Sequence, residues 1–70
     1  METYIITLVE TTKAYPKHCF YVCEITGILQ TTETLEHAYG TTSFEGATMV
    51  ADFVNERYDY KATVTPIKIG

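Results

Sequence analysis

Residues 42–58 constrain the fold of this chain most, because their apolar side chains have helical spacing and lie on two separate faces. Placed at about 100° per residue, one stripe of the helix carries Phe44, Ala47, Val50, Ala51, Val54 and Tyr58. Gly46, Met49 and Phe53 fall to one side of that stripe. A single stripe is enough to pack a helix against a sheet. We therefore predict that the first stripe enters the core and that the second apolar face contacts a partner.

The sequence also marks the start of this helix. Thr42 and Glu45 have the spacing of a capping box, in which the threonine hydroxyl accepts a hydrogen bond from the glutamate amide and the glutamate carboxylate reaches back to the threonine amide. At the other end, we expect the helix to fray between residues 59 and 61.

Most of the remaining chain is rich in β-branched and aromatic residues and is predicted to form strands at residues 3–9, 18–25, 28–36 and 62–69. The first of these has apolar residues at both alternating positions, as in a strand with neighbours on either side. Thr26 and Gly27 supply a tight turn between the second and third strands. Pro66 cannot donate a ladder hydrogen bond, which places the last strand at an edge.

The element order β-β-β-α-β predicts an α+β fold in a single domain over residues 1–70. The first three strands are expected to form a meander, and a right-handed crossover through the helix then lays the last strand beside the first. The result is a four-stranded mixed sheet in the order third, second, first, last, with one helix packed on one face. The other face is left open to solvent or to a second copy.

The charge of the chain limits the classes of partner. Nine acidic and five basic residues give a net charge of −4. Binding to nucleic acids and to anionic membranes depends largely on Lys and Arg, so neither partner is expected. The acidic balance favours a protein partner with a basic surface. Residues 2–9 read as a strand and lack the basic segment and apolar core of a signal peptide, and no apolar stretch approaches the roughly 20 residues of a membrane span. We therefore expect a cytoplasmic protein.

The two cysteines are the first candidates for metal or nucleophilic chemistry. In a regular strand Cys19 and Cys23 share a face, with Cα atoms about 13 Å apart, beyond the limit of about 7 Å for a disulfide. That separation also prevents shared zinc coordination with His18 or His37. No base or oxyanion hole accompanies either thiol, and the chain has no glycine-rich phosphate loop. We therefore expect no metal, no cofactor and no enzymatic activity.

The candidate site is the outward side of the helix, where acidic and apolar residues lie together. We predict that a protein partner is bound by Met49, Asp52, Phe53, Glu56 and Asp59. Glu45 lies on the same acidic face, and Glu33 and Glu36 join it if the third strand is close. Two plainer interpretations stay open: the acidic face is only solvated, or Phe53 folds over the edge of the sheet. The alternative function is a structural or assembly protein that forms a symmetric homodimer or larger oligomer through the open sheet face or an edge strand.

Several motifs together resemble the small orphan proteins encoded by bacteriophages and prophages. They are a strand beginning at Met1, a Thr-rich hairpin, a Thr-Ser-Phe-Glu helix start and a closing Val-Thr-Pro-Ile-Lys-Ile strand. The resemblance implies a stoichiometric binder that inhibits or redirects a host protein, with inhibitors of antiviral defence nucleases among the members of this group. An acidic surface that imitates the phosphate spacing of a nucleic acid would fit the basic cleft of such a nuclease. The resemblance assigns no functional residue.

Overall fold

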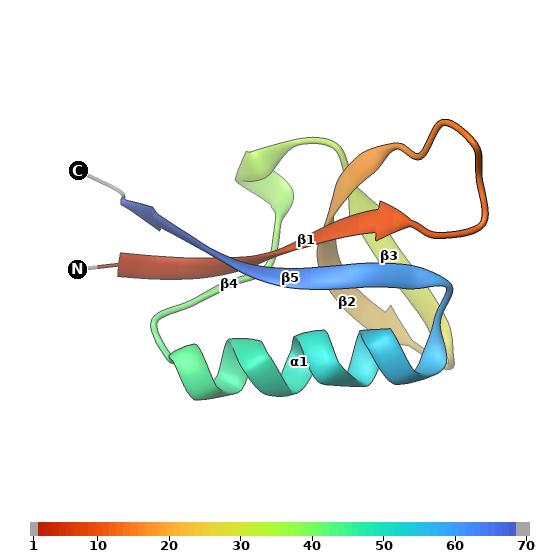
Figure 1. Cartoon of the computed structure of the whole chain (residues 1–70). Helices are drawn as coiled ribbons and strands as arrows, with labels where there is room; N and C mark the ends of the chain where they lie inside the picture. The colour runs from red at the N-terminus through yellow and green to blue at the C-terminus, as the bar shows by residue number, and fades with distance from the viewer. Residues whose placement is uncertain (1, 69–70) are drawn as a thin grey trace.

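The computed structural model describes residues 2–68 and consists of one helix packed against an antiparallel sheet (Figure 1). In chain order, its elements are β1 (Glu2–Glu10), β2 (His18–Ile25), β3 (Ile28–Thr32), the 3₁₀ helix η1 (Leu35–His37), β4 (Gly40–Thr41), α1 (Phe44–Arg57) and β5 (Tyr60–Lys68). The predicted α+β fold is confirmed. The sheet has five strands because it includes the short strand β4. The end of the last predicted strand, Ile69, lies outside the described residues.

β1 is the central strand of the sheet. β5 pairs with β1 along its whole length, while the other edge of β1 is shared between β2 at residues 7–9 and β4 at residues 4–5. β3 pairs with β2. The predicted order of third, second, first and last strand is therefore confirmed. Pro66 lies in β5, which pairs with β1 alone among the described residues, as expected for an edge strand.

Every pairing in the sheet is antiparallel, so the predicted mixed sheet is wrong. The difference arises at β4, which lies between the predicted third strand and the helix, where the sequence predicted no strand. Because β3 runs in the same direction as β1, a crossover from β3 would have made the last strand parallel to β1. Instead, η1 and the turn after it reverse the chain before β4. The crossover through α1 starts from β4 and brings β5 antiparallel to β1 on the opposite edge.

β3 is shorter than predicted and ends at Thr32. The Thr34 amide donates a hydrogen bond to Thr32 Oγ1 at 3.1 Å. Such local side-chain bonds compete with the hydrogen bonds of a sheet ladder. The His37 amide then donates to the Thr34 carbonyl oxygen at 3.1 Å and closes η1. These contacts turn the chain away from β2 four residues before the predicted end of the strand at Glu36.

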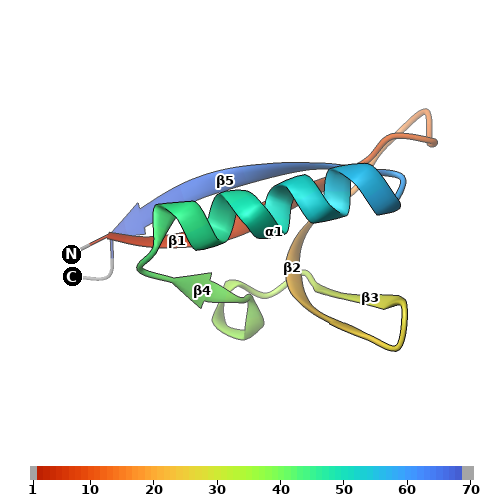
Figure 2. The same cartoon turned by 90° about the horizontal axis from the view of Figure 1, so that it is seen from below.

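The β2–β3 hairpin turns at the predicted position. Thr26 and Gly27 have φ angles of 49° and 81°, the positive values that a two-residue type I′ turn requires. The Tyr58 hydroxyl donates to the Gly27 carbonyl oxygen at 3.1 Å and ties the turn to the end of α1. Viewed from below, the hairpin projects away from the layer formed by α1, β1 and β5 (Figure 2).

The cap of α1 differs from the predicted capping box. The N-cap is Ser43, not Thr42, and its hydroxyl accepts a hydrogen bond from the Gly46 amide at 3.0 Å. A Cβ atom at position 46 would lie 3.3 Å from that hydroxyl oxygen, which is a tight contact. Glycine at this position therefore accommodates the cap, a role within the chain that the sequence interpretation did not give it.

The core lies between α1 and the β1–β5 pair. Ala47, Ala51 and Val54 of α1 are buried, as predicted, while Val50 and Tyr58 are half-buried. Across from them, the fully buried side chains of β1 are Ile6 and Leu8. Phe44 corrects the prediction, because it is 58% exposed and contacts only the edge of the core through the Tyr4 ring, at 5.4 Å between centroids. It occupies the first turn of the helix, beyond the centre of the sheet.

Candidate protein-binding surface

The predicted site residues lie on the outward side of α1. We call the following five residues the α1 surface: Met49, Asp52, Phe53, Glu56 and Asp59. Met49, Asp52 and Glu56 are spaced three or four positions apart and so form one stripe of the helix, and Phe53, four positions after Met49, borders this stripe. Met49 is 72% exposed, and Asp52 and Glu56, three and seven positions further along the helix, are also exposed. The structure thus brings together an apolar side chain and two carboxylates on a face that the core does not use.

Phe53 occupies the flank of the helix and is only half-buried. Its ring packs against the core and makes an edge contact with the Tyr58 ring, with centroids 6.2 Å apart. The Arg57 guanidinium lies 4.9 Å from the centroid of the same ring, within the range of a cation–π contact. Phe53 therefore contributes to the fold as well as to the surface. Met49 is the apolar residue of the α1 surface that is free for a partner.

Asp59 lies in the turn between α1 and β5, where its backbone is fixed. Its carbonyl oxygen accepts hydrogen bonds from the Thr11 amide and from the Thr11 hydroxyl, both at 3.1 Å. The side chain is exposed. These bonds attach the turn to the end of β1, so the exposed Asp59 lies at a fixed position just beyond the last turn of the helix.

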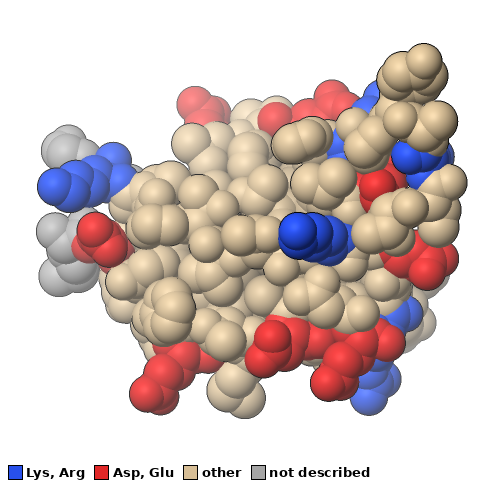
Figure 3. Space-filling model, viewed as in Figure 1, with Lys and Arg blue, Asp and Glu red and all other residues tan. Residues whose placement is uncertain are grey.

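Within residues 2–68, none of the carboxylates of the helix forms a salt bridge. Acidic side chains gather along the side of the molecule where α1 lies (Figure 3). In residues 2–68, the one salt bridge joins Lys13 Nζ to Glu10 Oε2 at 3.0 Å and includes no residue of α1. Glu36 does not join this acidic face, because it lines a groove on the opposite side of the sheet. The negative charge of the α1 surface is therefore open to an external cation.

Asn55 fixes α1 against the outer edge of β5. Its side-chain oxygen accepts a hydrogen bond from the Ala62 amide at 2.8 Å, and its side-chain nitrogen donates to the Ala62 carbonyl oxygen at 3.2 Å. The sequence interpretation missed this positioning residue. A signal was present, because Asn is unfavourable in the middle of a helix and needs a compensating contact there.

The cysteines do not share a face, contrary to the prediction. The register between β2 and β3 shifts between Tyr21 and Cys23, which makes Val22 the extra residue of a β-bulge. Tyr21 is opposite Thr31 and Cys23 is opposite Gln30, and such consecutive residues point to opposite faces. Tyr21 packs in the core, so Cys23 points to the other side. Across residues 2–68, no group of three His, Cys, Asp or Glu side chains is placed to hold a metal ion.

Burial raises the pKa of three groups in the sheet, the Cys19 thiol and the Tyr21 and Tyr60 hydroxyls. Their ordinary values are 9.0 for the thiol and 10.0 for the hydroxyls. In the unfolded chain these groups lose their protons first, so the unfolded state gains stability as the pH rises. The contribution of these groups to folding is therefore complete below about pH 8 and is lost above it.

We predict that the free energy of unfolding falls when the pH is raised from 8 to 10.5. Urea titrations at pH 7, 8, 9, 10 and 10.5, followed by far-UV circular dichroism, measure this change. A Cys19→Val variant should lose less stability than the wild type between pH 8 and pH 9.5, because its thiol is absent. An unfolding midpoint that does not change up to pH 10.5 would contradict the raised pKa values.

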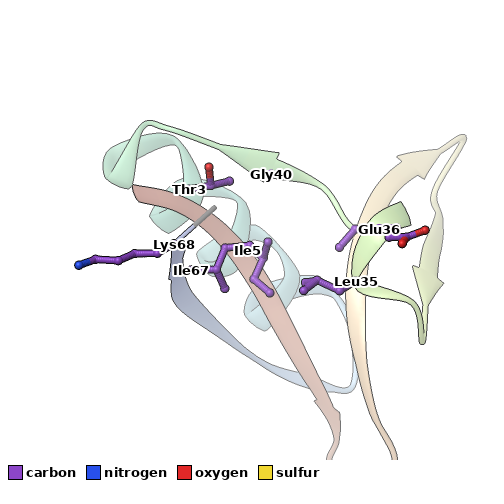
Figure 4. Close-up of a pocket in the computed structure, with 8 residues that line it drawn as sticks. Thr3, Ile5, Leu35, Glu36, Gly40, Ile67 and Lys68 are labelled. Carbon is purple, nitrogen blue, oxygen red and sulfur yellow. The ribbon is translucent and has the colours of Figure 1, made fainter. Parts of the chain in front are cut away.

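A groove of about 420 Å³ lies on the face of the sheet opposite α1 (Figure 4). Ile5 and Ile67 of the sheet and Leu35 of η1 supply its apolar lining, and Glu36 and Lys68 lie at its two ends. The groove exists because η1 covers part of the face that the sequence indicated to be open. Ile5 is 4% exposed beneath it. None of the predicted site residues reaches this groove.

Comparison of the chain with protein-family models, with curated proteins and with solved structures gives no match. Within residues 2–68, no helix is long and apolar enough to cross a membrane.

Proposed function

We propose that this protein is a non-enzymatic protein-binding module whose α1 surface docks on a basic surface of a partner protein. The resemblance to small bacteriophage proteins suggests that the partner is a host protein, such as a defence nuclease. Binding would then inhibit or redirect this host protein by covering its surface. The observation that carries this proposal is the exposed Met49 between carboxylates that have no salt-bridge partner in residues 2–68.

The arrangement of the α1 surface supports binding better than simple solvation. Protein interfaces combine an apolar centre with a polar rim, and Met is enriched at their centres. Met49 is 72% exposed, and the exposed carboxylates of Glu45 and Asp52 lie one turn before and one turn after it on the same face. A helix face that served only for solubility would need carboxylates but no exposed apolar side chain among them. The exposed Met49 therefore favours a binding role. Charge complementarity to a basic partner would speed association and select the partner.

The experiment is affinity capture from bacterial lysate with two variants of equal net charge. Asp52→Lys/Glu56→Lys reverses two charges on the α1 surface, and Glu2→Lys/Glu36→Lys reverses two exposed charges elsewhere. A protein captured by the wild type and the control but not by the α1 variant is the expected partner. Its affinity, measured by calorimetry with purified components, should fall at least tenfold in the α1 variant, about 1.4 kcal/mol.

Two further measurements on the same partner separate the apolar contribution from the charge. Met49→Ala should weaken binding at low and high salt alike, while raising the salt from 50 to 500 mM should weaken wild-type binding because surface charges are screened. Ile25→Ala, at the hairpin turn, is the matched apolar control because Ile25 is also exposed, at 56%. Equal capture by both charge variants would refute the assignment of binding to α1.

A further inference from the structure

The two outer strands of the sheet differ in how their free edges are protected. At the free edge of β5, the side chain of Asn55 from α1 forms hydrogen bonds with both the amide and the carbonyl of Ala62. Pro66 has no amide hydrogen, and Lys61 and Lys68 place charges along the same strand. Side-chain caps, prolines and lysines are the means by which natural sheets prevent pairing with another chain. The β5 edge is therefore closed to a further strand.

The edge of β3 lacks the proline and the charges that protect β5, and its own side-chain contact to the backbone is a long one, from Gln30 Nε2 to the Ile28 carbonyl oxygen at 3.5 Å. Its five residues, Ile28–Thr32, include no charged side chain and no proline. Ile25 and Ile28 flank the two-residue turn and exchange both of their backbone hydrogen bonds. In an antiparallel pair the next residue along the strand points its backbone groups the other way, so the Leu29 amide and carbonyl point away from β2. Ile28 is 62% exposed beside this edge. The hairpin extends away from the layer formed by α1, β1 and β5, and its contact with the end of α1 is at the turn, through Tyr58 and Gly27 (Figure 2).

We propose that β3 pairs antiparallel with β3 of a second copy around a twofold axis and joins the two sheets into one. A register centred on Gln30 places Leu29 opposite Thr31, and Ile28 opposite Thr32, of the second copy. This arrangement brings no like charges together across the axis, which favours self-pairing of β3. A dimer through the α1 surface would instead bring the carboxylates of two copies together. The β3 dimer leaves both α1 surfaces free.

The small contact area sets the strength of this dimer. Each copy contributes a strand of five residues, well below the 20–30 residues per side of a standard interface, so a dissociation constant in the range of about 10–100 μM is expected. The protein should be a monomer at about 1 μM and mainly a dimer near 1 mM. Since no ion pair contributes, high salt should not dissociate it.

The test is sedimentation equilibrium from 1 μM to 1 mM for the wild type, Gln30→Lys and Thr63→Lys. Gln30→Lys places two ammonium groups opposite each other at the axis and should raise the dissociation constant at least tenfold. Thr63→Lys makes the same change of charge at an exposed position of β5 and should leave the constant unchanged. Circular dichroism establishes that each variant is folded.

A second measurement on the wild type requires no substitution. In amide hydrogen exchange followed by NMR, the Leu29 amide should exchange more slowly at 1 mM than at 20 μM, because pairing protects it. The Val64 amide, in β5, serves as the internal control and should exchange at the same rate at both concentrations. A wild type that stays monomeric at 1 mM, an equal loss of dimer in both lysine variants, or a Leu29 amide whose exchange does not depend on concentration would each overturn the proposal.

Discussion

Replacement of Leu8 by alanine is expected to lower the free energy of unfolding by about 3 kcal/mol. Leu8 is 0% exposed, and it lies in β1 with Cys19 of β2 on one side and Ala62 of β5 on the other. Truncation removes the transfer free energy of three carbon atoms and leaves a cavity beneath α1. The core of a domain this small rarely supplies more than about 3–5 kcal/mol. The variant should therefore be largely unfolded, or close to it, at 25 °C.

Urea denaturation followed by far-UV circular dichroism at about 1 μM protein, where β3 is not paired with a second copy, measures this loss. Ile28→Ala is the control because it also truncates an aliphatic side chain in a strand, but one that is 62% exposed. We expect it to change stability by less than about 0.5 kcal/mol. A loss below about 1 kcal/mol in Leu8→Ala would mean that the core is not centred on β1.

Replacement of Asn55 by alanine is expected to lower the free energy of unfolding by about 2 kcal/mol. Both backbone groups of Ala62 lose their partners, at 2.8 and 3.2 Å, and among the described residues no other strand lies at that edge to replace them. The same substitution removes the cap that closes β5. Asn55→Ala should therefore also associate through β5 at high concentration, with a second pairing that the wild type does not form.

The helix propensity of alanine partly offsets the loss, and Asp52→Ala measures that gain at an exposed position one turn away. We expect Asp52→Ala to be neutral or slightly stabilising in the same urea titration. Asn55→Asp keeps an acceptor for the Ala62 amide but no donor for the Ala62 carbonyl, so its stability should fall between the wild type and Asn55→Ala. Equal stability of Asn55→Ala and Asp52→Ala would show that the two hydrogen bonds do not hold α1 on the sheet.

Local patterns in the sequence predicted the elements whose residues contact their immediate neighbours. The bounds of β2 and the position of the hairpin turn follow from alternation and from Gly27, and the buried face of α1 follows from the spacing of Ala47, Ala51 and Val54. The position of β1 between two strands follows from its apolar residues at both alternating positions. Each of these features needs only the period of a helix or a strand.

The candidate site was predicted in part. Helical spacing was sufficient to place Met49, Asp52 and Glu56 on one outward stripe. It did not determine how far Phe53 turns toward the core, because that depends on Tyr58 and Arg57 at its ring. The sequence also gave no partner for Asn55, since Ala62 lies seven positions away in another element. These features depend on how α1 is seated on β5, and periodicity does not contain that information.

By itself, the sequence determined an α+β chain with an amphipathic helix, a central apolar strand and a net charge of −4. Only the tertiary structure decided the direction of the last strand and the separation of the two cysteines between opposite faces. The first depends on β4, whose two residues form a strand only because β1 lies beside them. The second depends on one extra residue, Val22, opposite β3. Both features depend on how distant segments pair. A register shift of one residue moves the side chains of a strand to the opposite face of the sheet, and the alternation of residues along one strand does not reveal such a shift.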